Sequence, residues 1–311
     1  MRPFRKTQGG AGLLAMVVVI MAIAVAFVIG YGSNLAQKVK NDAYTQKMAY
    51  LQQVQAGILD FYQQHAFSLD QVGLGNPYTA QDLLNNSGEP IRYQVQAKLS
   101  NVLLDSSGVP YRVVVLYTPS DTDALNPPDL SNFASQGVFS SCLDPTKSCA
   151  KRAFVVFSSL QLERQLTQDT EKRLSTLAAK AEVYFADRRQ LDPEKDISRN
   201  YFNSPYGSCN GDPLDLGCFS SFDSGTGSNS LATENTDGSW SLTSVAKNLG
   251  ASLYDSMDAW GNPILASNNT SDINAFLGRS LTAPQSPPFV MLFRAYTPAG
   301  TYLQKAAIEP L

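Results

Sequence analysis

The sequence predicts an α+β fold. In this fold an N-terminal transmembrane helix continues into a long amphipathic helix, and two tandem heads follow, each a helix packed on a small antiparallel sheet. Three observations predict it. An uncharged apolar run covers residues 11–30, a stripe of apolar residues at helical spacing follows it, and a set of motifs then occurs twice in the same order.

Length and composition allow two ordinary domains beside the apolar run. The chain has 311 residues, of which 43% are hydrophobic, enough to fill real cores. Its formal net charge is only −3. A charge this small gives no long-range attraction to nucleic acid, so no nucleic-acid partner is expected.

The apolar run has the length of a membrane span. Residues 11–30 carry no charge and match the roughly 20 residues that cross a bilayer core as a helix. Arg2, Arg5 and Lys6 come just before it, so the positive-inside rule places the N-terminus in the cytoplasm. We therefore expect a single-pass inner-membrane protein with periplasmic heads. A cleaved secretory signal and a plain uncleaved anchor are the alternatives.

A long helix is expected to continue outward from the span. Residues 37–64 contain no proline and one glycine, Gly57. Apolar residues recur there mostly at spacings of three or four, which indicates one buried stripe. These residues are Val39, Ala43, Met48, Leu51, Val54, Ile58, Phe61 and Tyr62.

The same pattern occurs again later in the chain. A second helix is expected over about 160–189, where Leu174, Leu177, Ala179, Tyr184 and Phe185 repeat the spacing of Leu51, Val54, Ala56, Phe61 and Tyr62. The charged residues of this second helix, Glu163 and Arg173 among them, are assigned to its solvent side.

A turn motif, Asp-x-x-Gly-x-Pro, follows each helix. It is formed by Asp105, Gly108 and Pro110 in the first copy, and by Asp258, Gly261 and Pro263, with Trp260, in the second. In such a turn Asp accepts backbone N–H bonds, Gly supplies a positive φ and Pro leads into a strand. Each copy then has a strand ending in Tyr-Thr-Pro, at residues 117–119 and 296–298.

Two cysteine pairs indicate an oxidising compartment. Cys142 and Cys149 lie close in sequence, as do Cys209 and Cys218. Two local disulfides are favoured over a zinc site, because both spacings exceed the usual Cys-x2-4-Cys and the only histidine, His65, is distant. Three connectivities remain possible in principle.

No pattern of catalytic residues is present, so no enzymatic activity is expected. His65 ends an amphipathic helix, and no nucleophile, zinc-protease or phosphate-binding motif occurs. Trp260 is interpreted as a packing residue. No cofactor is expected. Asp212 and Asp215, or Asp121 and Asp123, are only weak candidates for calcium.

Two regions of the chain resemble the type IV pilin and pseudopilin family. Basic residues, then Gln8-Gly9-Gly10, then an apolar run resemble the prepilin leader, and Asp-x-Trp-Gly-Asn-Pro at 258–263 resembles the turn before the pilin sheet. The resemblance implies that a prepilin peptidase cuts after Gly10 and that Ala11 is then methylated. Ala15 stands where the family usually has glutamate, which fits a subunit that starts or caps a filament.

This resemblance, together with the repeat, divides the chain into four parts. Residues 1–10 are the prepilin-type leader, 11–31 the transmembrane helix, 32–160 the first pilin-like head and 161–311 the second. Strands are expected near 91–98, 110–117 and 153–158, and residues 198–250 and 264–288 are expected to form long loops.

The resemblance implies a structural function. We expect a minor pilin or pseudopilin of a type IV pilus, type II secretion or conjugative pilus system, with an adhesive or partner-binding role at the tip. Its partners would be other such subunits, through the N-terminal helix, the inner membrane and the prepilin peptidase. The alternatives are an anchored periplasmic binding protein that never enters a filament and a tethered hydrolase, which the missing catalytic residues disfavour.

Overall fold

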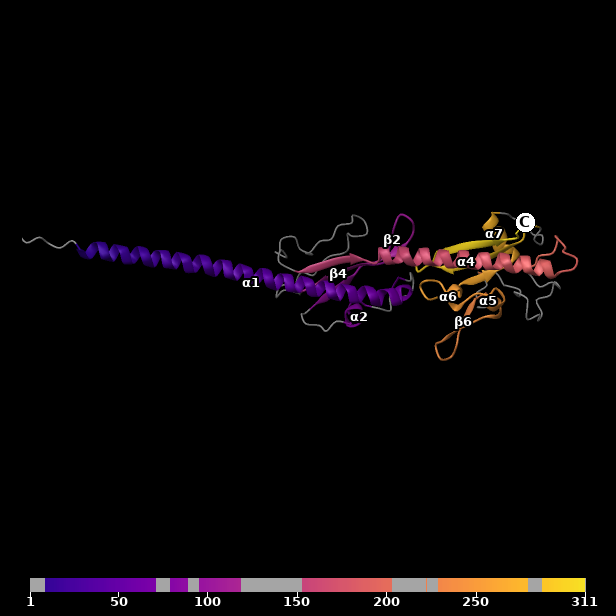
Figure 1. The fold of residues 1–311 in the computed structure, drawn as a ribbon, viewed down its shortest axis with the longest axis horizontal. Coiled ribbons are helices and arrows are strands. Elements are labelled where there is room, and N and C mark those ends of the chain that lie inside the picture. The colour runs from indigo at the N-terminus through magenta and orange to yellow at the C-terminus, as the bar shows by residue number, and fades with distance from the viewer. Residues whose placement is uncertain are drawn as a thin grey trace, which may run out of the picture.

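The molecule is an elongated rod in which two helix-and-sheet units follow one another along the axis of a long N-terminal helix (Figure 1). This computed structural model describes residues 9–70, 79–88, 95–118, 153–202, 222, 229–278 and 287–310. The structure is α+β with small antiparallel sheets.

Helix α1 runs from Gly9 to Asp70 and has 62 residues, which corresponds to a length of about 93 Å. Among the side chains of α1 that the structure describes, Tyr50 is the first buried one, where the first unit starts to cover the helix, and the preceding part of the helix projects from the body (Figure 1). The helix is interrupted at His65, which has φ −129° and ψ 15°. One further turn follows and places Ala66 and Leu69 in the core.

The first unit packs α1 on a three-stranded sheet. Strands β1 (Gln96–Leu99), β4 (Val113–Tyr117) and β5 (Phe154–Ser158) pair antiparallel in the order β1-β4-β5. The short hairpin of β2 (Leu103–Leu104) and β3 (Pro110–Tyr111) lies between β1 and β4 in the chain.

One core holds this unit together, and we call it the first core. It comprises Tyr50, Leu51, Val54, Ile58, Tyr62, Ala66, Leu69, Leu83, Leu84, Val95, Val114, Leu116, Ala153, Leu166 and Trp260. The two leucines at 83 and 84 come from α2 (Ala80–Asn85), a short helix whose N-terminus is fixed by a capping box between Thr79 and Asp82.

Helix α4 (Leu160–Leu191) follows β5 directly and belongs to both units. The Ser159 hydroxyl, one residue before the helix, donates to the Tyr62 hydroxyl at 3.0 Å and accepts the Arg112 N–H at 2.9 Å. These bonds hold the start of α4 against α1 and against Arg112, the residue just before β4. The helix ends at Leu191, with Asp192 as its C-cap, just before Pro193, which lacks a backbone donor.

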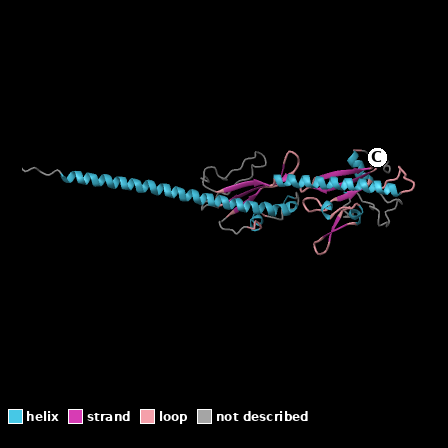
Figure 2. Ribbon diagram, in the orientation of Figure 1, coloured by secondary structure: helices cyan, strands magenta, loops and turns pink. Residues whose placement is uncertain are grey.

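The second unit repeats the arrangement of a long helix on a three-stranded sheet (Figure 2). Strands β8 (Leu265–Ser267), β9 (Val290–Tyr296) and β10 (Tyr302–Ile308) pair antiparallel in the order β10-β9-β8. Four smaller elements surround them. These are the hairpin β6 (Ala232–Glu234) and β7 (Trp240–Leu242), helix α5 (Ser244–Asn248), helix α6 (Leu253–Ser256) and helix α7 (Thr270–Leu277).

The two long helices bury equivalent positions. Leu51, Val54 and Tyr62 of α1 are buried, and so are their sequence counterparts Leu174, Leu177 and Phe185 of α4. The remaining aligned pairs also match: Ala56 and Ala179 are exposed, and Phe61 and Tyr184 are half-buried. The similar spacing in the two helices therefore corresponds to similar packing on the two sheets.

The transmembrane prediction is wrong. Within the part of the chain that the structure describes, no helix combines the length and the apolar character that a membrane crossing requires. Beyond the predicted span, Lys38, Lys40, Asp42 and Lys47 occur within ten residues of α1, and charges at this density are costly in hydrocarbon, so this part of the helix cannot extend a span. The predicted span over 11–31 and the single-pass inner-membrane location are corrected accordingly.

Two predicted loops are wrong in part. Residues 198–250 supply Tyr201, Phe202, Leu231, Val245, Ala246 and Leu249 to a second core, and residues 264–288 contain β8 and α7. Ser- and Gly-rich sequence concealed these short elements, because each has too few residues to show a period.

Gly57 is required by the close contact between α1 and Ser87, two residues after the end of α2. A Cβ atom built at Gly57 would lie 1.8 Å from the Ser87 carbonyl oxygen. We expect Gly57→Ala to lower the free energy of unfolding by about 2 kcal/mol or more, because the backbone at Ser87 would have to move away from the new methyl group. This loss outweighs the better helix propensity of alanine. Urea denaturation measures this loss. The exposed control Gln53→Ala should change stability by less than ~0.5 kcal/mol, and equal values for the two variants would contradict the close contact.

Candidate functional site

The projecting part of α1 is the first candidate surface. The predicted processing residues Gly10 and Ala11 lie in the first turn of the helix, at the end far from both units. Met21, Leu35 and Val39 are 62%, 57% and 61% exposed. Because 18 residues make five helical turns, Met21 and Val39 lie on the same face, with Leu35 about 40° away. We call these three exposed apolar side chains the apolar line of α1.

The junction between the two units is the second candidate. Trp260 belongs to the second unit by sequence, yet its ring packs in the first core. The indole N–H donates to a carboxylate oxygen of Glu163 at 2.9 Å, and Glu163 is 0% exposed. The sequence-based assignment of Glu163 to the solvent side of α4 is therefore wrong, since this carboxylate receives the tryptophan donor inside the protein.

Two more side chains of α4 bind the backbone of the turn that carries Trp260. The Thr170 hydroxyl accepts the Ala259 N–H at 3.0 Å. Arg173 donates to the carbonyl oxygens of Met257 and Asp258 at 2.9 and 2.8 Å, and its guanidinium lies 3.8 Å from the centre of the Tyr254 ring. Sequence reasoning missed these contacts, because a polar residue on a helix gives no signal of a partner some 90 positions away.

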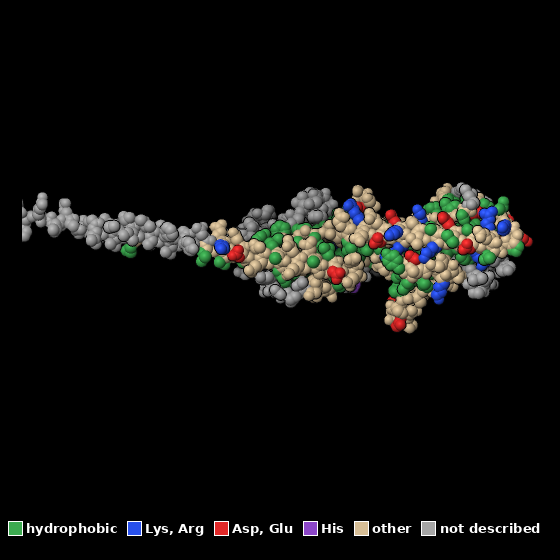
Figure 3. Space-filling model, in the orientation of Figure 1, with side chains coloured by type: hydrophobic (Ala, Val, Ile, Leu, Met, Phe, Trp, Pro, Cys, Tyr) green, Lys and Arg blue, Asp and Glu red, His purple; other side chains and the backbone are tan. Residues whose placement is uncertain are grey.

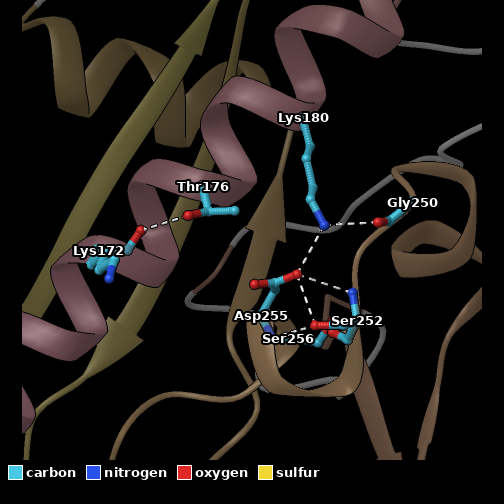
Figure 4. Close-up of polar contacts among 7 residues, drawn as sticks. All are labelled: Lys172, Thr176, Lys180, Gly250, Ser252, Asp255 and Ser256. Atoms are coloured by element: carbon cyan, nitrogen blue, oxygen red, sulfur yellow. Dashed lines mark hydrogen bonds and ion pairs between the residues drawn. The ribbon is translucent and has the colours of Figure 1, made fainter.

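A second tether joins α4 to α6, as Figure 4 shows. Lys180 reaches from α4 to the Gly250 carbonyl and to the Asp255 carboxylate, both at 2.8 Å. The same carboxylate accepts the Ser252 N–H and hydroxyl in the capping box of α6. The loop and short helix before the 258–262 turn are thereby fixed to α4.

The two predicted turn motifs have the same hydrogen bonds. Asp105 Oδ1 accepts the N–H groups of Ser107 and Val109, and Asp258 Oδ1 accepts those of Trp260 and Asn262, all at 2.8–2.9 Å. In both turns the glycine three residues after the aspartate has a positive φ, 79° at Gly108 and 89° at Gly261. Only glycine adopts this conformation without strain.

The same backbone pattern also occurs at residues 235–239 and 297–301. In all four places the first residue donates its N–H to the carbonyl of the fifth, and the N–H of a positive-φ glycine at position four bonds the carbonyl of the first. This is a three-residue hairpin loop with a type I turn. The predicted motif therefore marks a local turn. The two copies occupy different positions in the two units, since the first follows β1 and the second precedes β8.

The two aspartates sit in opposite environments. Burial raises the pKa of Asp258 to about 7; this residue is 2% exposed and its Oδ2 has no hydrogen-bond partner among the described residues. In contrast, the Val109 N–H and the Arg164 guanidinium lower the pKa of Asp105 below its usual value. Arg164 reaches Asp105 Oδ2 at 2.9 Å.

Several predicted site residues lie outside the described part of the chain. These are Cys142, Cys149, Cys209, Cys218, Asp121, Asp123, Asp212 and Asp215. Among the described residues, no group of three or more His, Cys, Asp or Glu side chains is placed to hold a metal ion. His65 lies at the interruption of α1, where its Nδ1 is 2.9 Å from the Phe61 carbonyl oxygen and its ring stacks on that of Phe61.

Asp258 makes stability depend on pH in a direction opposite to Asp105. A carboxyl group whose folded pKa is raised stabilises the fold at low pH, and this contribution is lost between pH ~4 and ~7 as the unfolded chain ionises first. We therefore compare the free energies of unfolding of Asp258→Asn and the wild type. As the pH rises from 4.5 to 7.5, their difference should change by roughly 2–4 kcal/mol in favour of the variant. Urea denaturation across this range measures the difference.

The matched control is Asp105→Asn in the equivalent turn. Because the pKa of Asp105 is lowered, its stabilising contribution is present above pH ~4 and lost as the pH falls further. The Asp105→Asn variant should therefore be less stable than the wild type at pH 7 and closer to it at pH 3. A parallel pH response of the two variants would contradict the two environments described.

Comparisons with known proteins give no relative for this chain. No family model matches the sequence, and neither a curated protein nor a solved structure matches it.

Proposed function

We propose that the chain is an assembly subunit of the minor pilin or pseudopilin kind, serving a type IV pilus, type II secretion or conjugative pilus system. The observation that carries the proposal is the length of α1 relative to the body that covers it. The helix has 62 residues, but its buried face begins only at Tyr50. Roughly the first 40 residues of the helix are thus available to other chains.

The sequence of this projecting part supports packing against similar helices. In the sequence, residues 11–30 form an uncharged and predominantly apolar run, and a helix of this composition is normally covered by other apolar groups. Copies of the same helix from neighbouring subunits provide this cover, with the apolar side chains packed side by side. The two units then face outward from the bundle of helices.

The body has features that suit an outer position. The two units extend the rod in line with α1, so the second unit lies at the greatest distance from the proposed helix bundle (Figure 1). Figure 3 shows charged side chains gathered over the second unit, whereas the visible face of the first unit is mostly apolar or uncharged polar. A charged distal unit is suited to contact with a partner, as at the tip of a filament.

Processing at Gly10 tests the leader part of the proposal. We expect Gly10→Val to block removal of residues 1–10, because the resemblance to prepilins implies a peptidase that cuts after this glycine. Mass spectrometry of the N-terminus in the native host is the measurement. Gly9→Val is the matched control and should still yield a chain that begins with methylated Ala11. Normal processing of Gly10→Val, or an intact Met1 in the wild type, would favour a binding protein that never assembles.

The exposed apolar line on α1 tests the packing part. Leu35→Asp and Val39→Asp leave the folded units untouched, since both side chains are exposed, but they place a charge in the proposed helix contact. We expect each variant to reduce incorporation into filaments at least tenfold, because a buried unpaired charge is costly. Immunoblots of sheared filament fractions measure incorporation. Asn41→Asp, also exposed on α1, is the control, and equal loss with this variant would count against a specific contact.

A further inference from the structure

Strand β10 leaves one edge of the second sheet open. The strand order β10-β9-β8 places it at the margin, and no described strand pairs with its outer side. The Thr297 N–H bonds the Thr301 carbonyl, and the Glu309 N–H bonds the Phe289 carbonyl. In an antiparallel ladder residues alternate in direction, so odd-numbered residues of β10 bond β9 and even-numbered ones point their backbone groups outward.

One outward group of this edge already has a substitute partner. The Ile308 N–H donates to Glu182 Oε1 of α4 at 3.3 Å, so a side-chain oxygen takes the place that a carbonyl of a further strand would occupy. Nearer the start of the strand, Tyr302, Gln304 and Ala306 also direct backbone N–H and carbonyl groups outward. The edge thus presents a row of hydrogen-bonding groups that is closed at one end by Glu182.

A groove runs beside the open part of this edge. It has a volume of about 420 Å³ and lies between β10 and α4. Its lining comprises Tyr302, Leu303, Gln304 and Lys305 of the strand and Glu171, Leu174 and Ser175 of the helix. An exposed strand edge is where an extended peptide can add to a sheet, and a groove beside it can receive alternate side chains of that peptide.

The outer face of the same edge offers an aromatic surface. Tyr302 is 53% exposed, and its ring meets that of Tyr296 edge-to-face at 6.4 Å between centroids. Beneath it, the Arg294 guanidinium lies 4.1 Å from the centre of the Tyr302 ring and 4.0 Å from that of Phe222. These contacts hold Tyr302 in place, so a cross-strand neighbour would find a fixed ring to pack on.

We propose that this groove binds an extended segment of a partner polypeptide, which pairs with β10 as a fourth strand of the second sheet. The backbone of the segment bonds the outward groups of Tyr302, Gln304 and Ala306. Its alternate side chains face α4, where Glu171 favours a basic residue, or the outer face, where Tyr302 favours an apolar or aromatic one. Lys305 adds a preference for an acidic residue near the middle of β10.

Exposed tyrosine rings can also bind sugars. Pairing with a peptide strand is favoured here because four consecutive residues of the β10 edge line the groove. Main-chain hydrogen bonds give such complexes their affinity, and the side-chain positions give them selectivity. This proposal does not rest on assembly through α1, since the groove lies wholly within the second unit. It survives or fails independently of processing at Gly10.

A phage-displayed library of random heptapeptides, selected on the immobilised full-length chain, provides the probe. We expect enrichment of sequences in which apolar residues alternate with a basic residue that meets Glu171 and an acidic residue that meets Lys305, and binding of the corresponding synthetic peptide in solution. Hydrogen exchange followed residue by residue should then show at least tenfold slower exchange at the amides of Tyr302, Gln304 and Ala306. The amides of residues 303, 305 and 307, which already bond β9, serve as the internal reference and should change little.

Two variants separate the groove from other surfaces. Ser175→Trp fills the groove from an exposed position of α4 and should weaken binding of the selected peptide at least tenfold. Val183→Trp places the same side chain on α4 outside the groove and should bind as the wild type does. Failure to enrich any peptide, equal binding by both variants, or binding without protection of the even-numbered amides would overturn the proposal.

Discussion

The structure depends on one buried contact, in which Met257 and the 258–262 turn pack against α4. Trp260 places its ring in the first core and donates its indole N–H to the fully buried Glu163 carboxylate. Thr170 and Arg173 bind the backbone of the same turn. A buried carboxylate needs such a donor, because removing its hydration without a hydrogen bond costs several kcal/mol. The two units are thereby joined by a packed polar contact as well as by the continuous helix.

This contact explains how the molecule is extended. Helix α4 lies in the first core at Leu166 and in the second core from Leu174 onward, so it leaves no flexible linker between the units. Because α1 ends within the first unit, α4 takes over as the axis of the second unit (Figure 2). The arrangement carries the second unit and its β10 edge away from the projecting part of α1. The two proposed surfaces, one for assembly and one for a peptide partner, are therefore well separated.

Local sequence patterns predicted some of the helices and strands but not others. The stripe in α4 predicted a helix over about 160–189, and the structure has Leu160–Leu191, because the apolar spacing and the following Pro193 both act within a few residues. The transmembrane prediction for α1 is wrong, because no helix in the described part of the chain has both the length and the apolar character of a membrane crossing. Helix α7 and strand β8 were missed, since elements of this length are stabilised by their packing on the sheet and not by their own pattern.

The sequence by itself determined that two long helices form, the buried stripe of α1 from Leu51 onward, and the turns at Asp105 and Asp258. Each of these depends on interactions between residues a few positions apart. Val39 and Ala43, expected in the same stripe, are exposed, so that part of the prediction is wrong. Tertiary structure alone decided that Glu163 is buried, that Trp260 belongs to the core of the other unit, and that the two aspartates of one motif have opposite pKa shifts. The physical reason is that burial and charge environment are set by neighbours distant in the chain, which residue spacing does not record.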